Sequence, residues 1–378
     1  VIGYYFPSSV IKGMLAAIGI TLILKEIPHA LGYDVDFMGD DAFFQSDKHN
    51  TISELFYALK ALSPGAIIIS TLSILVLVLF DRPFMKRFGL FKLLPGALFV
   101  VLLGVGLNEL YRFYLPSYFL SNEHLVNLPV SNSIKEFTSF FVFPDFSFLA
   151  NKDVYVVALT IALVGSLETL LSVEAIDKID PEKFVTPKNR ELAAQGVGNV
   201  VSGLLGGLPI TQVIVRSSAN VTSGGKSKLS AIVHGVFLLI TVVFIPFYLN
   251  LIPLASLSAI LLMVGYKLSK VELYKQMYRL GLGQFLPFII TILAVLFTDL
   301  LKGISIGIFI AILFILKRNH KNAYKKVDQV SEDGVIRIVL SEQITFINKG
   351  TLSDLLLKLP NDSEVELDGS KCQEIDYD

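Results

Sequence analysis

The stretch GLLGGLPITQVIVRSSANVTSGGKSK, residues 203–228, interrupts a long apolar part of the chain and decides the expected fold. Gly206, Gly207 and Pro209 end the helix before it, since proline lacks a backbone donor and glycine favours turns. PITQVIV is rich in β-branched residues, which favour extended backbone, and the serines after Arg216 favour the start of a new helix. A helix that begins at membrane depth points its free N–H groups and positive dipole end at the residues before it. The stretch therefore predicts an anion site that includes Arg216.

Composition indicates that this site lies in a membrane protein. The chain has 378 residues, of which 53% are hydrophobic and 17% charged, and a soluble domain of that size cannot bury so much apolar surface. The net charge of −1 argues against a broad basic face for nucleic acid. Cys372 is the single cysteine and the five histidines form no His-x-x-x-His pair, so we expect no disulfide, no metal centre and no cofactor.

Ten apolar segments approach the length of about twenty residues that a helix needs to cross the hydrocarbon core. Connections rich in Lys and Arg follow every even-numbered segment, and the connection after the first segment is rich in aspartate. Because Lys and Arg gather on the cytoplasmic side, this alternation predicts ten crossings of an inner (plasma) membrane with a cytoplasmic C-terminal region. The sixth segment is too polar to face lipid. The segments are 10–24, 64–80, 93–110, 154–175, 192–208, 210–223, 229–249, 254–268, 285–301 and 304–316.

The fourth segment carries an ionisable side chain, Glu168, within YVVALTIALVGSLETLLSVEAID (155–177). A carboxylate at membrane depth must be protonated, paired or neutralised by a cation, which makes it a candidate for function. Ser172 lies one helical turn later on the same face. We expect a functional carboxylate here. The alternatives are a structural ion pair, with Arg216 as the candidate partner, and a hydrogen-bonded packing residue.

The pattern changes beyond about residue 330. VIRIVL and EVELD are typical of strands, and NKGTLSDLLLKL between them is typical of an amphipathic helix. We expect the beginning of a small α/β domain over 330–378. Since the chain starts with Val1 and stops within EVELDGSKCQEIDYD, we expect truncation at both ends.

On these residues the chain resembles the SulP family of sulfate permeases and related anion exchangers. FPSSVIKGMLAAIGITLIL (6–24), SLETLLSVEAID (166–177) and NRELAAQGVGNVVSGLLGGLPITQVIVRSSANVTSGGKSKLSAI (189–232) carry the resemblance, and the last 44 residues or so are similar to the start of a STAS domain. The resemblance implies an all-α polytopic fold of two inverted repeats with seven spans each. This chain would lack the first four of those fourteen spans. The resemblance also implies a homodimer. It implies a transmembrane domain over 1–318, with a gate (1–110 and 254–316) that moves against a core (153–249), and a truncated STAS domain over 330–378.

The resemblance also implies roles for single residues. Glu168 falls where the family often has a carboxylate that lines the site or couples a cation, and Ser172 falls where bicarbonate-transporting relatives have a hydroxyl that helps hold sodium. Arg216 falls on a basic residue next to the anion pocket, and Val215 stands where animal members often have serine. The expected substrate-binding residues are Leu208, Thr211, Val215, Arg216 and Ser217.

Together these expectations describe a secondary active transporter of a small inorganic oxyanion of the sulfate or bicarbonate class, working by alternating access with H⁺ or Na⁺ as the coupling cation. One alternative is a nucleobase-type symporter of the same fold, although a neutral base needs no Arg216, and another is a channel-like anion conductor. A membrane-embedded enzyme would need a catalytic constellation, which the sequence lacks. A regulatory scaffold would act through its tail, and the identity of the anion stays open.

Overall fold

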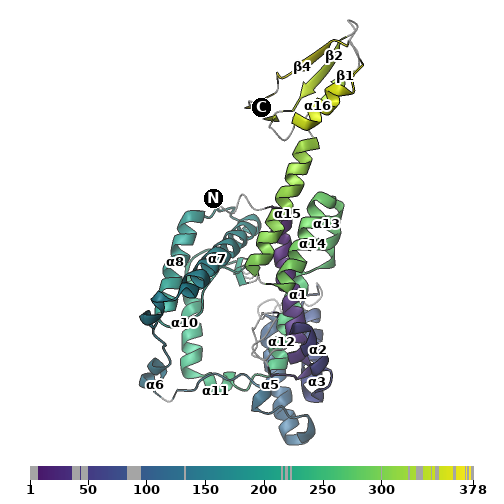
Figure 1. Cartoon of the computed structure of the whole chain (residues 1–378). Helices are drawn as coiled ribbons and strands as arrows, with labels where there is room; N and C mark the ends of the chain where they lie inside the picture. Colours follow the sequence, from purple (N-terminus) through teal and green to yellow (C-terminus); the bar gives the residue numbers. More distant parts are fainter. Residues whose placement is uncertain are drawn as a thin grey trace.

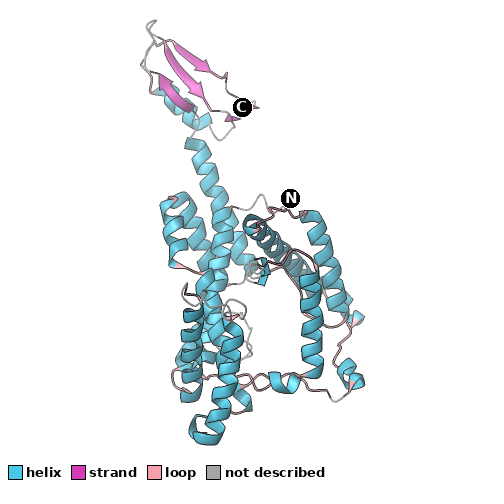
Figure 2. Cartoon of the chain, turned by 180° about the vertical axis from the view of Figure 1, so that it is seen from behind, coloured by secondary structure: helices cyan, strands magenta, loops and turns pink. Residues whose placement is uncertain are grey.

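The computed structural model describes residues 7–35, 43, 50–82, 95–131, 133–213, 216–217, 220–221, 224–298, 300–321, 324–328, 335–341, 343–344, 349–360, 363–370, 372 and 374–375. Helices form the bulk of the molecule, and a small sheet stands apart from them at the end of α15 (Figures 1 and 2). The end of the helical part from which α15 extends to the sheet is called the sheet end, and the opposite end is called the distal end (Figure 1). Val215, one of the predicted site residues, lies outside the described residues.

Within the described residues, nine of the ten predicted segments coincide with helices, and the sixth forms neither helix nor strand as far as Val213. Three helical stretches are long and apolar enough to cross a membrane, namely Gly96–Tyr114, Lys152–Leu170 and Leu254–Arg279. Pro64–Phe80, Leu229–Phe244 and Leu282–Phe297 are also apolar but shorter.

Six of the helices pack on one another in a bundle, with α1 in contact with four of the others. The bundle buries small and apolar side chains, among them Ala16, Ala17 and Phe288. Two short helices lie beside it, α2 (Thr51–Ala58) against α1 and α13 (Val271–Arg279) against α14. The six are α1 (Ser8–Leu31), α3 (Pro64–Phe80), α5 (Gly96–Tyr114), α12 (Leu254–Leu268), α14 (Leu282–Phe297) and α15 (Leu300–Lys321).

Close backbone contacts at glycine hold this bundle together. A Cβ added to Gly19 of α1 would lie 2.7 Å from the carbonyl oxygen of Gly265 in α12, and one added to Gly265 would lie 2.6 Å from the carbonyl oxygen of Gly19. Small residues of this kind let membrane helices approach closely enough for dense van der Waals packing. The α1–α12 contact therefore has no room for any side chain at either position.

Helix α1 runs seven residues beyond its predicted end at 24 and includes Pro28 in its last turn. The charged residue Lys25 does not end the helix, because its ammonium group lies 3.4 Å from the carboxylate of Glu54 in α2 and both side chains are buried. A buried charge is tolerated when it is paired in this way. The helix ends instead at Gly32, whose φ of 85° is the left-handed conformation of a C-terminal cap.

Three further long helices, α7 (Lys152–Ile179), α8 (Lys188–Leu204) and α10 (Leu229–Phe244), lie beside the bundle (Figure 1). α7 and α8 pack on each other, and α7 also contacts α15. α8 stops before its predicted end at 208, where Gly206 has a φ of 77°. The predicted segment 229–249 is divided at Pro246, which starts the short helix α11 (Pro246–Leu249), because proline cannot continue the hydrogen bonding of α10.

The sheet at the end of α15 has the predicted strand, helix and strand in order. β2 (Ile336–Leu340) pairs in parallel with β4 (Val365–Asp368), and α16 (Lys349–Leu357) connects them. β1 (Tyr324–Asp328) pairs antiparallel with β2, so the sheet includes residues ahead of position 330. β3 (Gln343–Ile344) and β5 (Glu374–Ile375) form a second, two-stranded pair. Ile336, Ile338 and Leu340 of β2 pack against leucines of α16 and the residues after it.

Two connections at the distal end join the bundle to α7 and α10. The first runs from α5 to α7 and contains η3 (Pro116–Tyr118), η4 (Asn122–His124), α6 (Ile134–Ser139) and η5 (Phe146–Ala150), and the second runs from α10 to α12 through α11. They are tied to each other, since Leu125 and Pro253 form an antiparallel bridge and Val126 N–H donates to the carbonyl of Ile252 at 3.0 Å.

A buried carboxylate attaches the first connection to α1. Asp34 receives hydrogen bonds from the Nδ1 atoms of His29 and His124, both at 2.6 Å, although His124 is 90 residues away in the sequence. Burial alone would raise the pKa of Asp34, but the hydrogen bonds from His124 and His29 lower it below its ordinary value. The hydrogen bond to Asp34 raises the pKa of His124, although burial alone would lower it. The negative charge of Glu123 also raises this pKa.

These shifts predict a pH-dependent stability. The contribution of Asp34 is present above the ordinary carboxyl pKa of about 4 and is lost as pH falls through its lowered folded value. The contribution of His124 is complete below the ordinary imidazole pKa of about 6.5 and is lost as pH rises through its raised folded value. The attachment is therefore strongest between about pH 4 and 6.5.

We expect His124→Gln to lower the melting temperature most within that window, by about 2–4 °C, the shift given by roughly 1 kcal/mol. The difference from the unmodified protein should shrink towards pH 9. Thermal unfolding of purified protein across this pH range measures it, with His234→Gln on the exposed face of α10 as the control. A deficit of equal size at every pH would contradict the expectation.

Candidate functional site

The extended residues after α8 are held by side chains of that helix. Asn199 binds both backbone groups of Ile210, since Ile210 N–H donates to Oδ1 at 2.7 Å and Nδ2 donates to the Ile210 carbonyl at 2.9 Å. Gln195 Nε2 donates to the same carbonyl at 3.3 Å, and Ser202 Oγ donates to the carbonyl of Leu208 at 2.8 Å. These side chains supply the hydrogen-bond partners that backbone groups outside a helix or sheet would otherwise lack.

Helix α7 holds the next two residues. Thr211 Oγ1 donates to Glu168 Oε2 at 3.1 Å, and Gln212 N–H donates to Thr169 Oγ1 at 3.2 Å. The helix can approach because Gly165 has no side chain: an added Cβ would lie 3.2 Å from the Thr211 methyl and 3.3 Å from Gln195 Nε2. The carboxylate identified from the sequence thus contacts the extended segment directly.

A short helical piece follows the extended segment. Ser217 N–H donates to the carbonyl of Val213 at 3.3 Å, the spacing of a first α-helical hydrogen bond. At the other end, Gly225 N–H donates to Asn220 O and Gly224 N–H to Val221 O, with Gly224 at a φ of 86°. This pair of bonds is a Schellman cap.

The structure places the other predicted site residues around this break. Arg216 is exposed and, among the described residues, forms no ion pair, so the alternative of a structural pair with Glu168 is wrong for this structure. Leu208 is 83% exposed and takes part through its carbonyl group, as Thr211 does through its hydroxyl. Ser217 is half-buried, and Ser172 is 2% exposed on α7, one turn beyond Glu168.

Four of the side chains that shape the site were not predicted: Thr169, Gln195, Asn199 and Ser202. The last three recur at spacings of four and three residues in a segment that is otherwise apolar, which puts them on one face of a helix. That periodic polar stripe was the available signal. It could not show which backbone atoms the stripe would meet.

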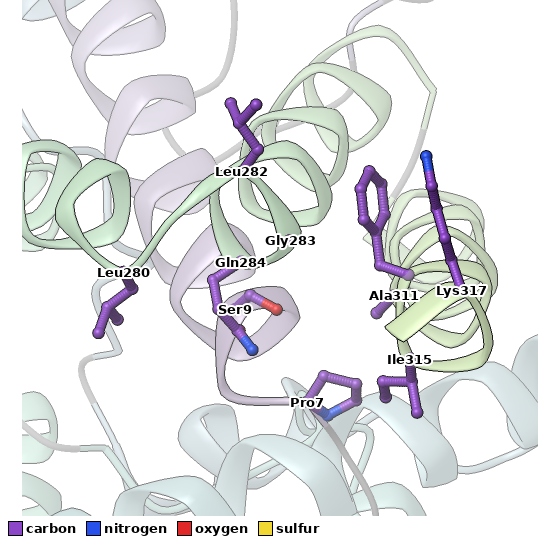
Figure 3. A pocket seen from close by; sticks show the side chains of 10 residues that line it. Pro7, Ser9, Leu280, Leu282, Gly283, Gln284, Ala311, Ile315 and Lys317 are labelled. Atoms are coloured by element: carbon purple, nitrogen blue, oxygen red, sulfur yellow. The ribbon is translucent and has the colours of Figure 1, made fainter. Parts of the chain in front are cut away.

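One cavity in the described part of the chain lies away from this site. A pocket of about 490 Å³ lies between the start of α1, the turn before α14 and the last turns of α15, and Figure 3 shows Ser9, Gln284 and Lys317 around it. None of its lining residues belongs to the predicted site.

The chain combines apolar helices of membrane-spanning length with a segment whose helix is broken and whose backbone groups are bound by side chains. A carboxylate contacts that segment. This combination is typical of a membrane transport protein. The chain belongs to the sulfate permease family, whose model matches residues 1–292. The family and the relatives below are transporters, which confirms that the chain is not an enzyme.

Two curated relatives illustrate the family. The putative sulfate transporter YvdB of Bacillus subtilis (strain 168) is 28% identical over 316 residues, which cover 83% of this chain and 55% of that protein. The bicarbonate transporter BicA of Picosynechococcus sp. (strain ATCC 27264 / PCC 7002 / PR-6) is 24% identical over 355 residues, 93% of this chain and 58% of that protein. The chain thus spans little more than half the length of each of these two relatives.

A solved structure shows the same fold. The murine Slc26a9 anion transporter in its inward-facing state superposes with a TM-score of 0.72 at 16% sequence identity, over 99% of this chain and 61% of that one. The predicted class of transporter fold is therefore confirmed, and the small terminal sheet is compatible with part of a STAS domain.

Proposed function

We propose that the protein is a secondary transporter that moves a small inorganic oxyanion of the sulfate or bicarbonate class by alternating access, coupled to H⁺ or Na⁺. The observation that carries the proposal is the hydrogen bond between Glu168 and Thr211. It joins a carboxylate of α7 to the extended residues immediately before Arg216, so a charge change at one is felt at the other. Membership of the sulfate permease family, and its relatives' names as sulfate and bicarbonate transporters, support the substrate class.

The anion is proposed to bind where the extended segment turns into the helical piece. N–H groups of alternate residues in an extended strand point to opposite edges. Those of Ile210 and Gln212 are used by Asn199 and Thr169. Within the described part of the chain, those of Thr211 and Val213 donate no hydrogen bond, which leaves them for a ligand. The helix start and Arg216 add positive potential.

The coupling cation is proposed to bind at Glu168, with Ser172 on the same face of α7. An ionised carboxylate in contact with the anion segment repels an anion through a medium of low dielectric. A proton or Na⁺ on Glu168 removes that repulsion, so anion binding becomes conditional on the cation. For Na⁺, the hydroxyl oxygens of Ser172 and Thr211 are suitable ligands.

The moving parts are proposed to be a gate (1–110 and 254–316) and a core (153–249). The packing of α1, α3, α5, α12, α14 and α15 on one another, and of α7 mainly on α8, supports this division. The sheet end is proposed to be cytoplasmic, with residues 330–378 belonging to a STAS domain, and the protein is proposed to form a homodimer. Substrate then crosses as the core shifts past the gate.

Substitution of Arg216 tests the anion side. Arg216→Ala is expected to raise the KM for oxyanion uptake about tenfold or more, because it removes a charged donor worth roughly 1.5–3 kcal/mol. Arg216→Lys keeps the charge without the guanidinium geometry and should lie between the two. Radiolabelled sulfate and bicarbonate uptake measures the change, and Arg190→Ala on exposed surface of α8 serves as the control. An unaltered KM in Arg216→Ala would assign the residue a structural role.

A further inference from the structure

An asparagine side chain takes the place of a neighbouring strand beside the extended segment 207–213. A residue in a sheet has its N–H and C=O bound by backbone groups of the adjacent strand. Asn199 gives Ile210 the same two bonds from one amide, at 2.7 and 2.9 Å. An amide is the side chain suited to this, because it carries a donor and an acceptor side by side.

The same device occurs elsewhere in the chain, which shows that the geometry is not peculiar to one residue. Asn250 binds both backbone groups of Leu128, with Leu128 N–H donating at 2.7 Å and Nδ2 donating at 2.9 Å. Asn108 binds both groups of Leu120 at 2.9 and 3.4 Å. These two sites lie in the distal connections and at α5, away from Glu168 and Arg216, and provide a matched comparison.

We propose that Asn199 is a positioning residue of the anion site: it fixes which edge of segment 207–213 faces α8 and which edge is left for the anion. The proposal rests on the transport function proposed above. Among the described residues Asn199 forms no hydrogen bond with Glu168 or Arg216, and it acts through Ile210.

The backbone contacts of the segment recur at every second residue, at Leu208, Ile210 and Gln212, which is the period of an extended chain and determines the edge that each N–H group faces. With Ile210 held by Asn199 and Gln212 held by Thr169, the N–H groups of Thr211 and Val213 must point to the other edge. A slip or a twist of one residue would exchange the two sets. Pro209 has no N–H, and Gly207 N–H already donates to the carbonyl of Ser202 at 2.7 Å, so the segment offers no further free donor on that edge before Thr211.

Gln195 and Ser202 lie on the same face of α8 as Asn199 and also bind the segment, but each of them binds only a carbonyl group. Gln195 Oε1 is buried and has no hydrogen-bond partner in the described residues. Asn199 is thus the side chain among these three that binds an N–H group of the segment, and its loss frees an amide whose exchange with solvent deuterium can be followed.

The test uses Asn199→Leu, which keeps the size and removes both bonds, and Asn199→Gln, which keeps both groups on a longer side chain. Hydrogen–deuterium exchange is measured on the full chain in lipid nanodiscs, over peptides that contain residues 205–213. We expect exchange there to be about tenfold faster in Asn199→Leu and intermediate in Asn199→Gln. Sulfate uptake by the same preparations should show KM raised about tenfold while the maximal rate stays within about twofold.

Asn250→Leu is the matched control, because it removes two bonds of the same lengths. It should speed exchange around Leu128 and leave both segment 207–213 and the KM unchanged. If Asn199→Leu does not fold, Thr169→Val is used, since it removes the acceptor for Gln212 N–H at nearly constant volume and should speed exchange in the same peptides.

Unchanged exchange over 205–213 in folded Asn199→Leu would overturn the proposal, as would a rise in KM of equal size in Asn250→Leu. A protein that binds and carries no oxyanion, yet shows the faster local exchange, would refute the transport function while the structural role of Asn199 in holding the segment stands. The two failures are therefore distinguishable.

Discussion

Glu168→Gln is expected to remove the dependence of oxyanion uptake on the coupling cation, and to lower uptake about tenfold or more because a cation gradient no longer coupled to the anion cannot drive its accumulation. Glutamine keeps an oxygen that can accept the hydrogen bond from Thr211, at 3.1 Å in the present structure, so the local geometry has a reason to persist. What it removes is the charge. Without a carboxylate there is no repulsion for H⁺ or Na⁺ to neutralise, and no reason for anion binding to wait for the cation.

The measurement is initial uptake of labelled sulfate and bicarbonate against external pH, and separately against Na⁺, at matched amounts of protein. Glu182→Gln is the control, since Glu182 is an exposed carboxylate paired with Lys226 at 2.7 Å outside the helices. If Glu168→Gln retains the uptake and the cation dependence of the unmodified protein, the coupling role of Glu168 is wrong. Loss of pH dependence would identify H⁺, and loss of Na⁺ dependence would identify Na⁺.

Gly19→Leu is expected to have the largest effect on stability. A Cβ at this position already lies 2.7 Å from the carbonyl oxygen of Gly265 and 2.9 Å from the Leu268 Cβ, and backbone cannot move aside as a flexible side chain can. The added side chain must separate α1 from α12, which lie together along the bundle. Overpacking costs about 3 kcal/mol at the upper end of its usual range, and the backbone contact places this case there.

Two measurements on the detergent-solubilised protein test this expectation: the melting temperature, and the monodispersity seen by size-exclusion chromatography. Gly106→Leu in α5 is the matched control, because no atom lies within 4 Å of a Cβ added there. Gly19→Leu should give a much lower melting temperature or no monodisperse protein, and Gly106→Leu should resemble the original. Equal effects of the two substitutions would show that the α1–α12 contact is not a special constraint.

Much of the membrane region was predictable because its signals are local. Segments 64–80 and 254–268 coincide with α3 and α12, and the break near Pro209 follows from the residues that surround it. The two strands and the helix predicted for the tail are also present in the structure, because their sequence patterns are local as well. Boundaries failed where a distant partner decided them. α1 continues through Lys25 because Glu54 pairs with it, and no local pattern around residue 25 indicates that pair.

The site was predictable only in part for the same physical reason. Glu168 stands out as a charge in an apolar segment, but its contact with Thr211 joins residues 43 positions apart. The histidines looked scattered, whereas folding brings His29 and His124 to the two oxygens of Asp34. Asn199 is one polar residue among several on α8, and its importance comes from the carbonyl and N–H of Ile210 that happen to face it.

The most direct test of the central claim, that residues 208–217 bind an oxyanion, is equilibrium binding of labelled sulfate to the purified full chain in competition with unlabelled ligands. We predict saturable binding that bicarbonate or excess sulfate displaces, that a neutral nucleobase such as uracil does not displace, and that Arg216→Ala weakens about tenfold. Displacement by uracil with no effect of either oxyanion would contradict the account.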